Sequence, residues 1–186
     1  IGIAHTRWAT HGEPNDINAH PHLDHTESIA LIHNGIIENH DILRKALETE
    51  GINFVSETDS EVLVQLISPF YKKGGLNFPD AVRAALQEVI GAYGIVVISK
   101  DDPDIIVAAR YGSPLVLGVG KDEYFIASDA SPIIEHTRNV IFLGEGEMVT
   151  ISPNGHEIKN IYKNKVISKV VTQLDMTVEQ IEKGNF

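Results

Sequence analysis

The sequence predicts a fold of the α+β class, in which antiparallel sheets pack face to face and helices lie outside them. Two observations lead to this prediction. Helical spacing of apolar residues is confined to the first half of the chain, whereas the second half consists of short apolar runs separated by turns. Because helices do not alternate with the later strands, a doubly wound parallel sheet is the less favoured arrangement.

Two strands and a long loop are expected before the first helix. Residues 1–8 form an apolar, β-prone run, and residues 9–27 are rich in Gly, Pro, Asn, Asp and His. A loop of that length inside a compact domain is usually functional. Residues 28–33 form a second apolar run that ends at Asn34-Gly35, a strong turn signal.

Periodic apolar spacing then predicts three helices, over residues 39–50, 58–71 and 78–90. Asn39 can cap the first helix, and Gly51 can stop it. The second helix opens with Thr58-Asp59-Ser60-Glu61, which fits a capping box. A short strand is expected between these two helices, over residues 52–55.

The second half of the chain predicts a β meander. Six short β runs follow one another at hairpin-like spacing, over residues 93–99, 105–110, 114–118, 124–128, 140–143 and 148–152. Turn sequences separate several of them, including residues 101–104 and 153–155, and a short helical turn is expected after Ser131-Pro132. Residues 166–186 are polar and weakly periodic, which indicates a linker.

Composition limits the classes of function. The chain has 186 residues, no cysteine and a net charge of −11. The charge argues against nucleic acid and anionic membranes as partners. The lack of cysteine excludes disulfides and a cysteine nucleophile within this chain, and a cytoplasmic setting is the default expectation. The first residues read as the middle of a buried strand, which suggests that further residues precede them.

Histidines are concentrated near the start of the chain. Six of the nine lie in the first 33 residues: His5, His11, His20, His22, His25 and His33. They could be metal ligands, or they could hydrogen-bond to a loop backbone. Familiar ligand spacings such as His-Glu-x-x-His are absent from the sequence, so we expect no metal site and no cofactor.

Three further features suggest an amino-acid site. Arg7 is the only Arg or Lys among the first 43 residues. It could grip a carboxylate in a bidentate fork or pair with Glu13 or Asp16. Asn34 and the N–H of Gly35 could form an oxyanion hole or merely a turn.

Asp59, in the first turn of its helix, could bind a substrate ammonium or only complement the helix dipole. Together with the Arg7 and Asn34-Gly35 features, it would serve an α-amino acid that carries a side-chain acyl group. A nucleophile is not evident. Ser28, Ser56 and Thr58 are available, but none lies in a nucleophile-elbow pattern.

A family resemblance follows from four strings: His5-Thr6-Arg7-Trp8-Ala9-Thr10-His11-Gly12, Asn18-Ala19-His20-Pro21, His33-Asn34-Gly35 and Glu57-Thr58-Asp59. Together they closely resemble the glutaminase domain of the glucosamine-6-phosphate synthase (glutamine–fructose-6-phosphate aminotransferase, isomerising) family. These are class II glutamine amidotransferases with an N-terminal-nucleophile hydrolase fold. The resemblance implies an αββα four-layer sandwich of two antiparallel sheets with outer helices, here missing its N-terminal strands.

The resemblance also assigns roles to individual residues. Arg7 would bind the α-carboxylate of L-glutamine, Asp59 would bind its α-ammonium, and Asn34 with Gly35 would form the oxyanion hole. The remaining implied site residues belong to loops: Thr10 and His11 in the loop that closes over glutamine, His20 in the active-site loop, and Trp8 at the mouth of the ammonia channel.

One departure from the family pattern is that the family's nucleophile is an N-terminal cysteine, which this chain lacks. We therefore expect a truncated glutaminase domain over residues 1–165 that does not hydrolyse glutamine alone. Residues 166–186 would form a tail leading to an absent sugar isomerase domain, in a protein that is a homo-oligomer when full length. The alternatives are a class II amidotransferase with another acceptor and a non-catalytic, His-rich metal- or ligand-binding module.

Overall fold

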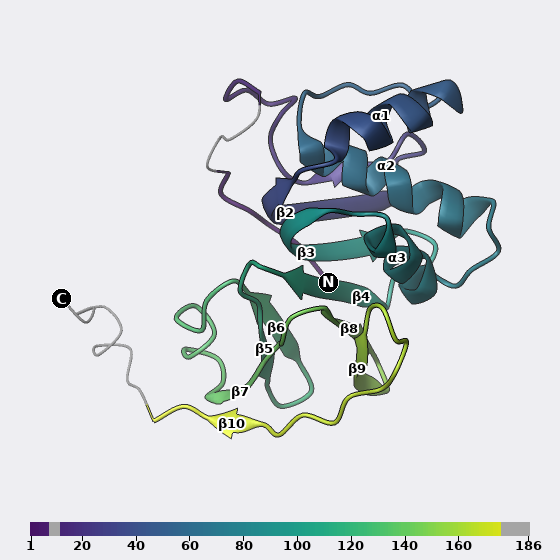
Figure 1. The fold of residues 1–186 in the computed structure, drawn as a ribbon. Coiled ribbons are helices and arrows are strands. Elements are labelled where there is room, and N and C mark those ends of the chain that lie inside the picture. The colour runs from purple at the N-terminus through teal and green to yellow at the C-terminus, as the bar shows by residue number, and fades with distance from the viewer. Residues whose placement is uncertain (8–11, 176–186) are drawn as a thin grey trace.

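The computed structural model describes residues 1–7 and 12–175, which form two antiparallel sheets (Figure 1). The larger sheet has six strands, in the spatial order β1 (His22–Leu23), β2 (Ile29–Ile37), β3 (Gly91–Ser99), β4 (Ile106–Tyr111), β8 (Glu147–Ser152) and β9 (Gly155–Asn160). The smaller sheet has four, in the order β10 (Thr172–Gln173), β7 (Asn139–Phe142), β5 (Val116–Val119) and β6 (Tyr124–Ala127).

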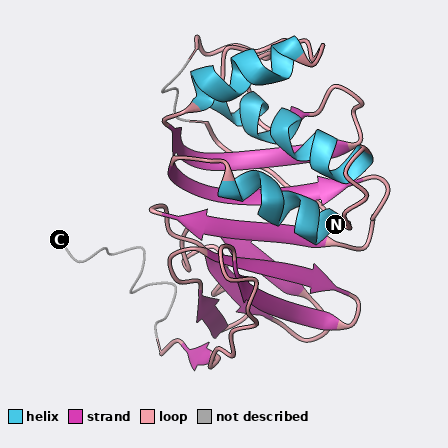
Figure 2. Ribbon diagram, turned by 45° about the vertical axis from the view of Figure 1, so that its right-hand side comes forward, coloured by secondary structure: helices cyan, strands magenta, loops and turns pink. Residues whose placement is uncertain are grey.

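Three helices cover the outer face of the larger sheet (Figure 2): α1 (His40–Thr49), α2 (Asp59–Lys72) and α3 (Phe78–Gln87). Strand β3 shows how the layers form. Its Tyr93, Ile95 and Val97 are buried under the helices, whereas Val96 faces the smaller sheet. Successive side chains alternate between the two faces of a strand, so one strand contributes to two cores. The predicted α+β sandwich is confirmed.

The outer face of the smaller sheet is covered differently. Among the described residues no helix lies on it. A helical turn over residues 130–137, predicted from Ser131-Pro132, instead packs Ile133 against Val116 and Val140. A Cβ built on Gly118 would lie 2.5 Å from Ile133 Cγ2, so the turn sits directly on the sheet.

The predicted turn at Asn34-Gly35 is wrong, because β2 continues through both residues to Ile37. The antiparallel ladder with β3 is continuous over nine residue pairs, from Ile29↔Ser99 to Ile37↔Gly91. Gly35 has a φ of +140°, and a Cβ there would lie 2.1 Å from the carbonyl oxygen of Ala92. Glycine is therefore needed for close approach of two strands and not for a reversal of the chain.

The helices begin where the sequence predicts, but their caps differ in detail. Thr58 Oγ1 accepts a hydrogen bond from Glu61 N at 3.1 Å, as a capping box requires. The Glu61 carboxylate accepts from the backbone N–H groups of Val55 and Ser56, and so it holds the chain that enters α2. The side chain of Asn39 does not cap α1; it bridges Glu88 O and Ile90 N instead.

Several strand predictions also need correction. Residues 1–7 are not a strand, although Ile3 packs into the core between the sheets, because they pair with no neighbouring strand. Residues 52–55 are not a strand either, since Ile52 N donates to Leu47 O and Val55 N to the Glu61 carboxylate. The polar strand β9 and the two-residue strands β1 and β10 were not predicted, because they lack an apolar run.

The C-terminal segment stays on the domain for part of its length. Val166 forms a β-bridge with Lys159, and β10 pairs with β7. The described part of the expected linker therefore extends the smaller sheet, and residues 176–186 lie outside the described residues. None of the helices described is long and apolar enough to span a membrane.

Candidate active site

A cleft of about 340 Å³ opens beside the middle of β2. Its floor includes Asn34 and Gly94 from the paired strands β2 and β3. One wall is the N-terminal segment, with His5 and Thr6, and the other wall includes Ser128 at the end of β6. The two sheets and the segment that leads to Arg7 thus meet at Asn34.

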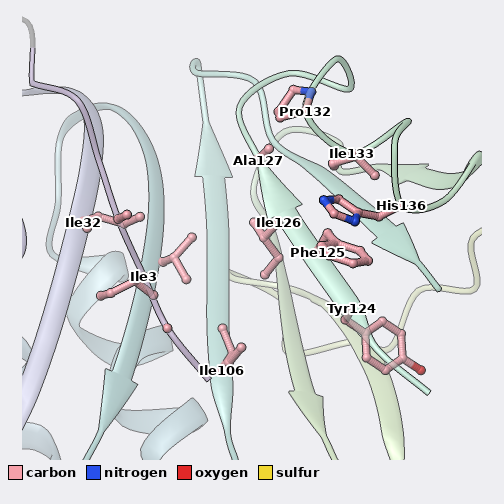
Figure 3. Close-up of a pocket in the computed structure, with 13 residues that line it drawn as sticks. Ile3, Ile32, Ile106, Tyr124, Phe125, Ile126, Ala127, Pro132, Ile133 and His136 are labelled. Carbon is pink, nitrogen blue, oxygen red and sulfur yellow. The ribbon is translucent and has the colours of Figure 1, made fainter. Parts of the chain in front are cut away.

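A second cavity, of about 270 Å³, lies next to this cleft and shares Ala4, Ile32 and Ala127 with it. Figure 3 shows that Ile3, Ile32 and Ile106 lie toward one side of it and Tyr124, Phe125 and Ile126 toward the other. Its labelled side chains are mainly apolar. The polar side chains that could bind a substrate therefore line the first cleft.

Strand geometry leaves the N–H of Gly35 available at an edge of β2. In an antiparallel ladder, backbone N–H groups point alternately toward and away from the partner strand. The N–H of Ile37 points away from β3, because it donates to Asp59 Oδ2 at 2.8 Å. Gly35 lies two residues earlier, so its N–H points to the same edge, where β1 covers only Ala30 and Leu31.

Asp59 joins the start of α2 to the end of β2. Its side chain is 95% buried, and Oδ2 accepts the hydrogen bond from Ile37 N. Oδ1 has no hydrogen-bond partner among the described residues, so it can receive a donor from a ligand. Asp59 thus does more than complement its own helix dipole, since it fixes α2 to the strand that carries Asn34 and Gly35.

His33 lies beside Asp59 and was not singled out as a site residue. Its Nδ1 is 2.9 Å from Ser60 Oγ and 4.0 Å from Asp59 Oδ2. Burial lowers the pKa of His33, and the nearby Asp59 carboxylate opposes that shift. The alternation of side chains along β2 could have indicated that His33 is buried. His33 occupies the same face of β2 as Leu31 and Ile37, which are core positions.

Arg7 lies at the mouth of the long loop. Its guanidinium donates to the carbonyl oxygens of Gly12 and Glu13, both at 3.3 Å. The loop is held in turn by Asn18, whose side chain donates to Glu13 O and accepts from Glu57 N. Arg7 is thereby connected to the segment that precedes Asp59.

His20 packs against other histidines. Its ring centroid is 4.4 Å from that of His5 and 4.9 Å from that of His22, and both contacts are edge to face. Mainly through burial, and then through the neighbouring His5, the pKa of His20 falls to about 3. Although these rings are close together, no group of three His, Asp or Glu side chains among the described residues is arranged to hold a metal ion.

The structure thus brings together some of the predicted residues. Asn34, Gly35 and Asp59 lie on or against the end of β2, and His20 packs behind the segment that ends at Arg7. Three of the predicted residues, Trp8, Thr10 and His11, lie outside the described residues.

Residues 5–148 match the model of a protein family described as the glutamine amidotransferase domain. The chain belongs to this family. It is 55% identical over its whole length to the glutamine–fructose-6-phosphate aminotransferase (isomerising) of Chlorobaculum tepidum and 49% identical to that of Bacteroides thetaiotaomicron. It spans about 30% of the length of each of these relatives. Membership of the amidotransferase family, expected from the four sequence strings, is confirmed.

Solved structures agree with the fold. Glutamine phosphoribosylpyrophosphate amidotransferase from B. subtilis, complexed with ADP and GMP, aligns with a TM-score of 0.71 at 27% identity, over 86% of this chain and 34% of that chain. A glutamine aminotransferase class-II domain protein from Silicibacter pomeroyi aligns with a TM-score of 0.56 at 19% identity, over 78% of this chain and 71% of that chain. The second likeness shows the fold alone.

Proposed function

We propose that this amidotransferase domain binds L-glutamine at the end of β2 and hydrolyses its side-chain amide within a glutamine–fructose-6-phosphate aminotransferase. The observation that carries the proposal is the joint placement of Asn34, Gly35 and Asp59. The N–H of Gly35 and the N–H that binds Asp59 point to the same edge of β2. The buried carboxylate of Asp59 is therefore bound to a backbone N–H that lies two residues along β2 from the N–H of Gly35.

Each polar group of glutamine has a complementary group in the domain. Asp59 Oδ1 would accept from the α-ammonium, and the Arg7 guanidinium would hold the α-carboxylate in a bidentate pair. The amide oxygen would lie between the Asn34 side chain and the N–H of Gly35. Thr10 and His11 would close over the bound substrate, and Trp8 would lie where ammonia leaves, as the family resemblance implies.

The chemistry would be acyl transfer. A cysteine thiolate outside the 186 residues forms a bond to the amide carbon, and the negative oxygen of the tetrahedral intermediate is stabilised by Asn34 and Gly35. The carbon–nitrogen bond then breaks, and ammonia leaves after protonation. Water hydrolyses the thioester, which releases glutamate and regenerates the thiol.

The identity of the acceptor is supported by sequence similarity. Relatives that are 44–55% identical to this chain carry the fructose-6-phosphate name, whereas the aligned phosphoribosylpyrophosphate enzyme is 27% identical. Ammonia would pass to a sugar isomerase domain of the same polypeptide, reached through residues 166–186, in a homo-oligomer. Residues 1–165 would constitute the glutaminase domain.

Glutamate release by the full-length protein tests this proposal. We expect hydrolysis of glutamine and formation of glucosamine-6-phosphate when fructose-6-phosphate is supplied. The 186-residue chain, which has no cysteine, is expected to release no glutamate. Hydrolysis without amination of fructose-6-phosphate, but with amination of phosphoribosylpyrophosphate, would move the protein to another acceptor class. Absence of hydrolysis would overturn the proposal.

A further inference from the structure

Three histidine rings form a continuous column between the N-terminal segment and helix α2. The column consists of His5, His20 and His22, with ring centroids 4.4 Å and 4.9 Å apart and interplanar angles of 61° and 79°. Its last member is fixed by a hydrogen-bonding contact of 3.1 Å between His22 Nε2 and Thr58 Oγ1. Aromatic rings in edge-to-face contact favour this arrangement over a face-to-face one.

The two ends of the column adjoin the two proposed binding groups for glutamine. His5 precedes Arg7 by two residues along the N-terminal segment. Thr58 is the N-cap of α2 and directly precedes Asp59. The column therefore spans from the segment that carries Arg7 to the residue that precedes Asp59.

The charges of Arg7 and Asp59 both affect the pKa of His22, the last ring of the column. Burial lowers the pKa of His22 to about 4, and the remaining contributions include Glu61, Arg7 and Asp59, of which Arg7 lowers the pKa and the two carboxylates raise it. The pKa of His5 is also lowered by burial. The rings are thus neutral near pH 7 and can pack together without mutual repulsion.

We propose that His20 is a positioning residue, which holds the Arg7 segment at a fixed distance from Asp59 by packing between His5 and His22. This inference rests on the proposed binding of glutamine. An α-amino acid offers its carboxylate and ammonium at a fixed separation, so a site that takes one group from the start of a helix and the other from a distant segment of the chain needs contacts that set the distance between them. His20 supplies the middle of these contacts.

The test is steady-state hydrolysis by the full-length protein, with glutamine and with its α-carboxamide analogue as substrates. In His20→Ala the middle ring is lost, and we expect KM for glutamine to rise about tenfold while kcat changes little. The preference for glutamine over the α-carboxamide should fall as well, because Arg7 no longer meets the carboxylate correctly. A purely structural loss would lower both substrates' kcat/KM equally.

Two variants complete the design. His20→Phe keeps a ring between His5 and His22 and is expected to restore KM to within about twofold of the wild type. His156→Ala removes a different edge-to-face pair, with Tyr124 at 5.5 Å, and is expected to leave KM unchanged. If His20→Ala does not accumulate as folded protein, His20→Leu, which fills the space without a ring, is expected to show the same rise in KM.

The outcomes separate the two proposals. Wild-type hydrolysis together with unchanged KM and unchanged preference in His20→Ala or His20→Leu would overturn the positioning role alone. A wild-type protein that does not hydrolyse glutamine would overturn the proposed function, and the positioning role with it.

Discussion

The two ends of the proposed glutamine site are built in different ways. At the ammonium end, Asp59 is buried at the junction of α2 and β2 and accepts a backbone hydrogen bond from Ile37. At the carboxylate end, Arg7 lies on a segment that pairs with no strand among the described residues, and its guanidinium contacts loop carbonyl oxygens. The comparison teaches that one end takes its geometry from the core, whereas the other depends on side-chain contacts that can be changed without dismantling the sheets.

The largest effect is expected in the oxyanion hole, which lies on β2, the core strand that Asp59 contacts. Asn34→Ala removes one donor to the developing oxyanion, so kcat of the full-length enzyme should fall on the order of 10²–10³-fold with little change in KM. Asn154→Ala, in the exposed turn between β8 and β9, serves as the control. A kcat within threefold of the wild type in Asn34→Ala would remove Asn34 from the mechanism.

A smaller effect is expected when the charge at the ammonium end is removed. Asp59→Asn retains an oxygen that can accept from Ile37 N but loses the ion pair with the substrate ammonium. A hydrogen bond to a charged group contributes about 1.5–3 kcal/mol, so KM for glutamine should rise roughly 10–100-fold.

The matched control for this variant is Asp80→Asn, which changes an aspartate in the first turn of α3. Isothermal titration with glutamine, on enzyme whose nucleophile has been replaced, gives the binding change directly. Equal affinity in Asp59→Asn and the wild type would contradict the assignment of the ammonium to Asp59.

At the carboxylate end, a conservative substitution should change the KM for glutamine by a smaller factor. Arg7→Lys keeps the positive charge but loses the planar fork, so we expect KM for glutamine to rise by up to about tenfold with kcat nearly unchanged. Arg138→Lys, at an exposed position, is the control. An unchanged KM in Arg7→Lys would count against carboxylate binding by Arg7.

The remaining prediction concerns stability toward acid and not the reaction. The pKa of His22 is about 4 in the folded protein and about 6.5 when unfolded, so the unfolded state binds more protons between these values. The free energy of unfolding should therefore fall as pH falls from 6.5 to about 4, by up to about 1.4 kcal/mol per pH unit from this group.

Thermal midpoints measured across this pH range check the prediction. His22→Phe should flatten the dependence, whereas His156→Phe, at an exposed position, should leave it as in the wild type. Parallel curves for the wild type and His22→Phe would show that His22 does not contribute to acid sensitivity.

Much of the fold could be predicted from the sequence because period and capping are local properties. The capping box at residues 58–61 and the alternation along β3 specify their elements without reference to distant residues. Asn34-Gly35 was misread because the same dipeptide serves a turn and a close approach of strands. Only the partner, Ala92 in β3, distinguishes the two.

The candidate site was predicted in part for the same reason. Short strings pointed to Arg7, Asn34, Gly35 and Asp59, but the geometry that connects them depends on residues far apart in sequence. The column of His5, His20 and His22 ends on Thr58, which lies 36 residues beyond His22, so no spacing rule could reveal it. His20 was named from the family resemblance without a physical role, and its packing now suggests one.

The most direct test of a glutamine site completed by an external cysteine is covalent labelling of the full-length protein with a glutamine analogue that carries an electrophile at the side-chain carbonyl position. The position of the adduct is then located by peptide mass spectrometry. We predict one adduct, on a cysteine outside the 186 residues, whose formation glutamine suppresses. Labelling within the 186 residues, or labelling that glutamine does not suppress, would contradict the account.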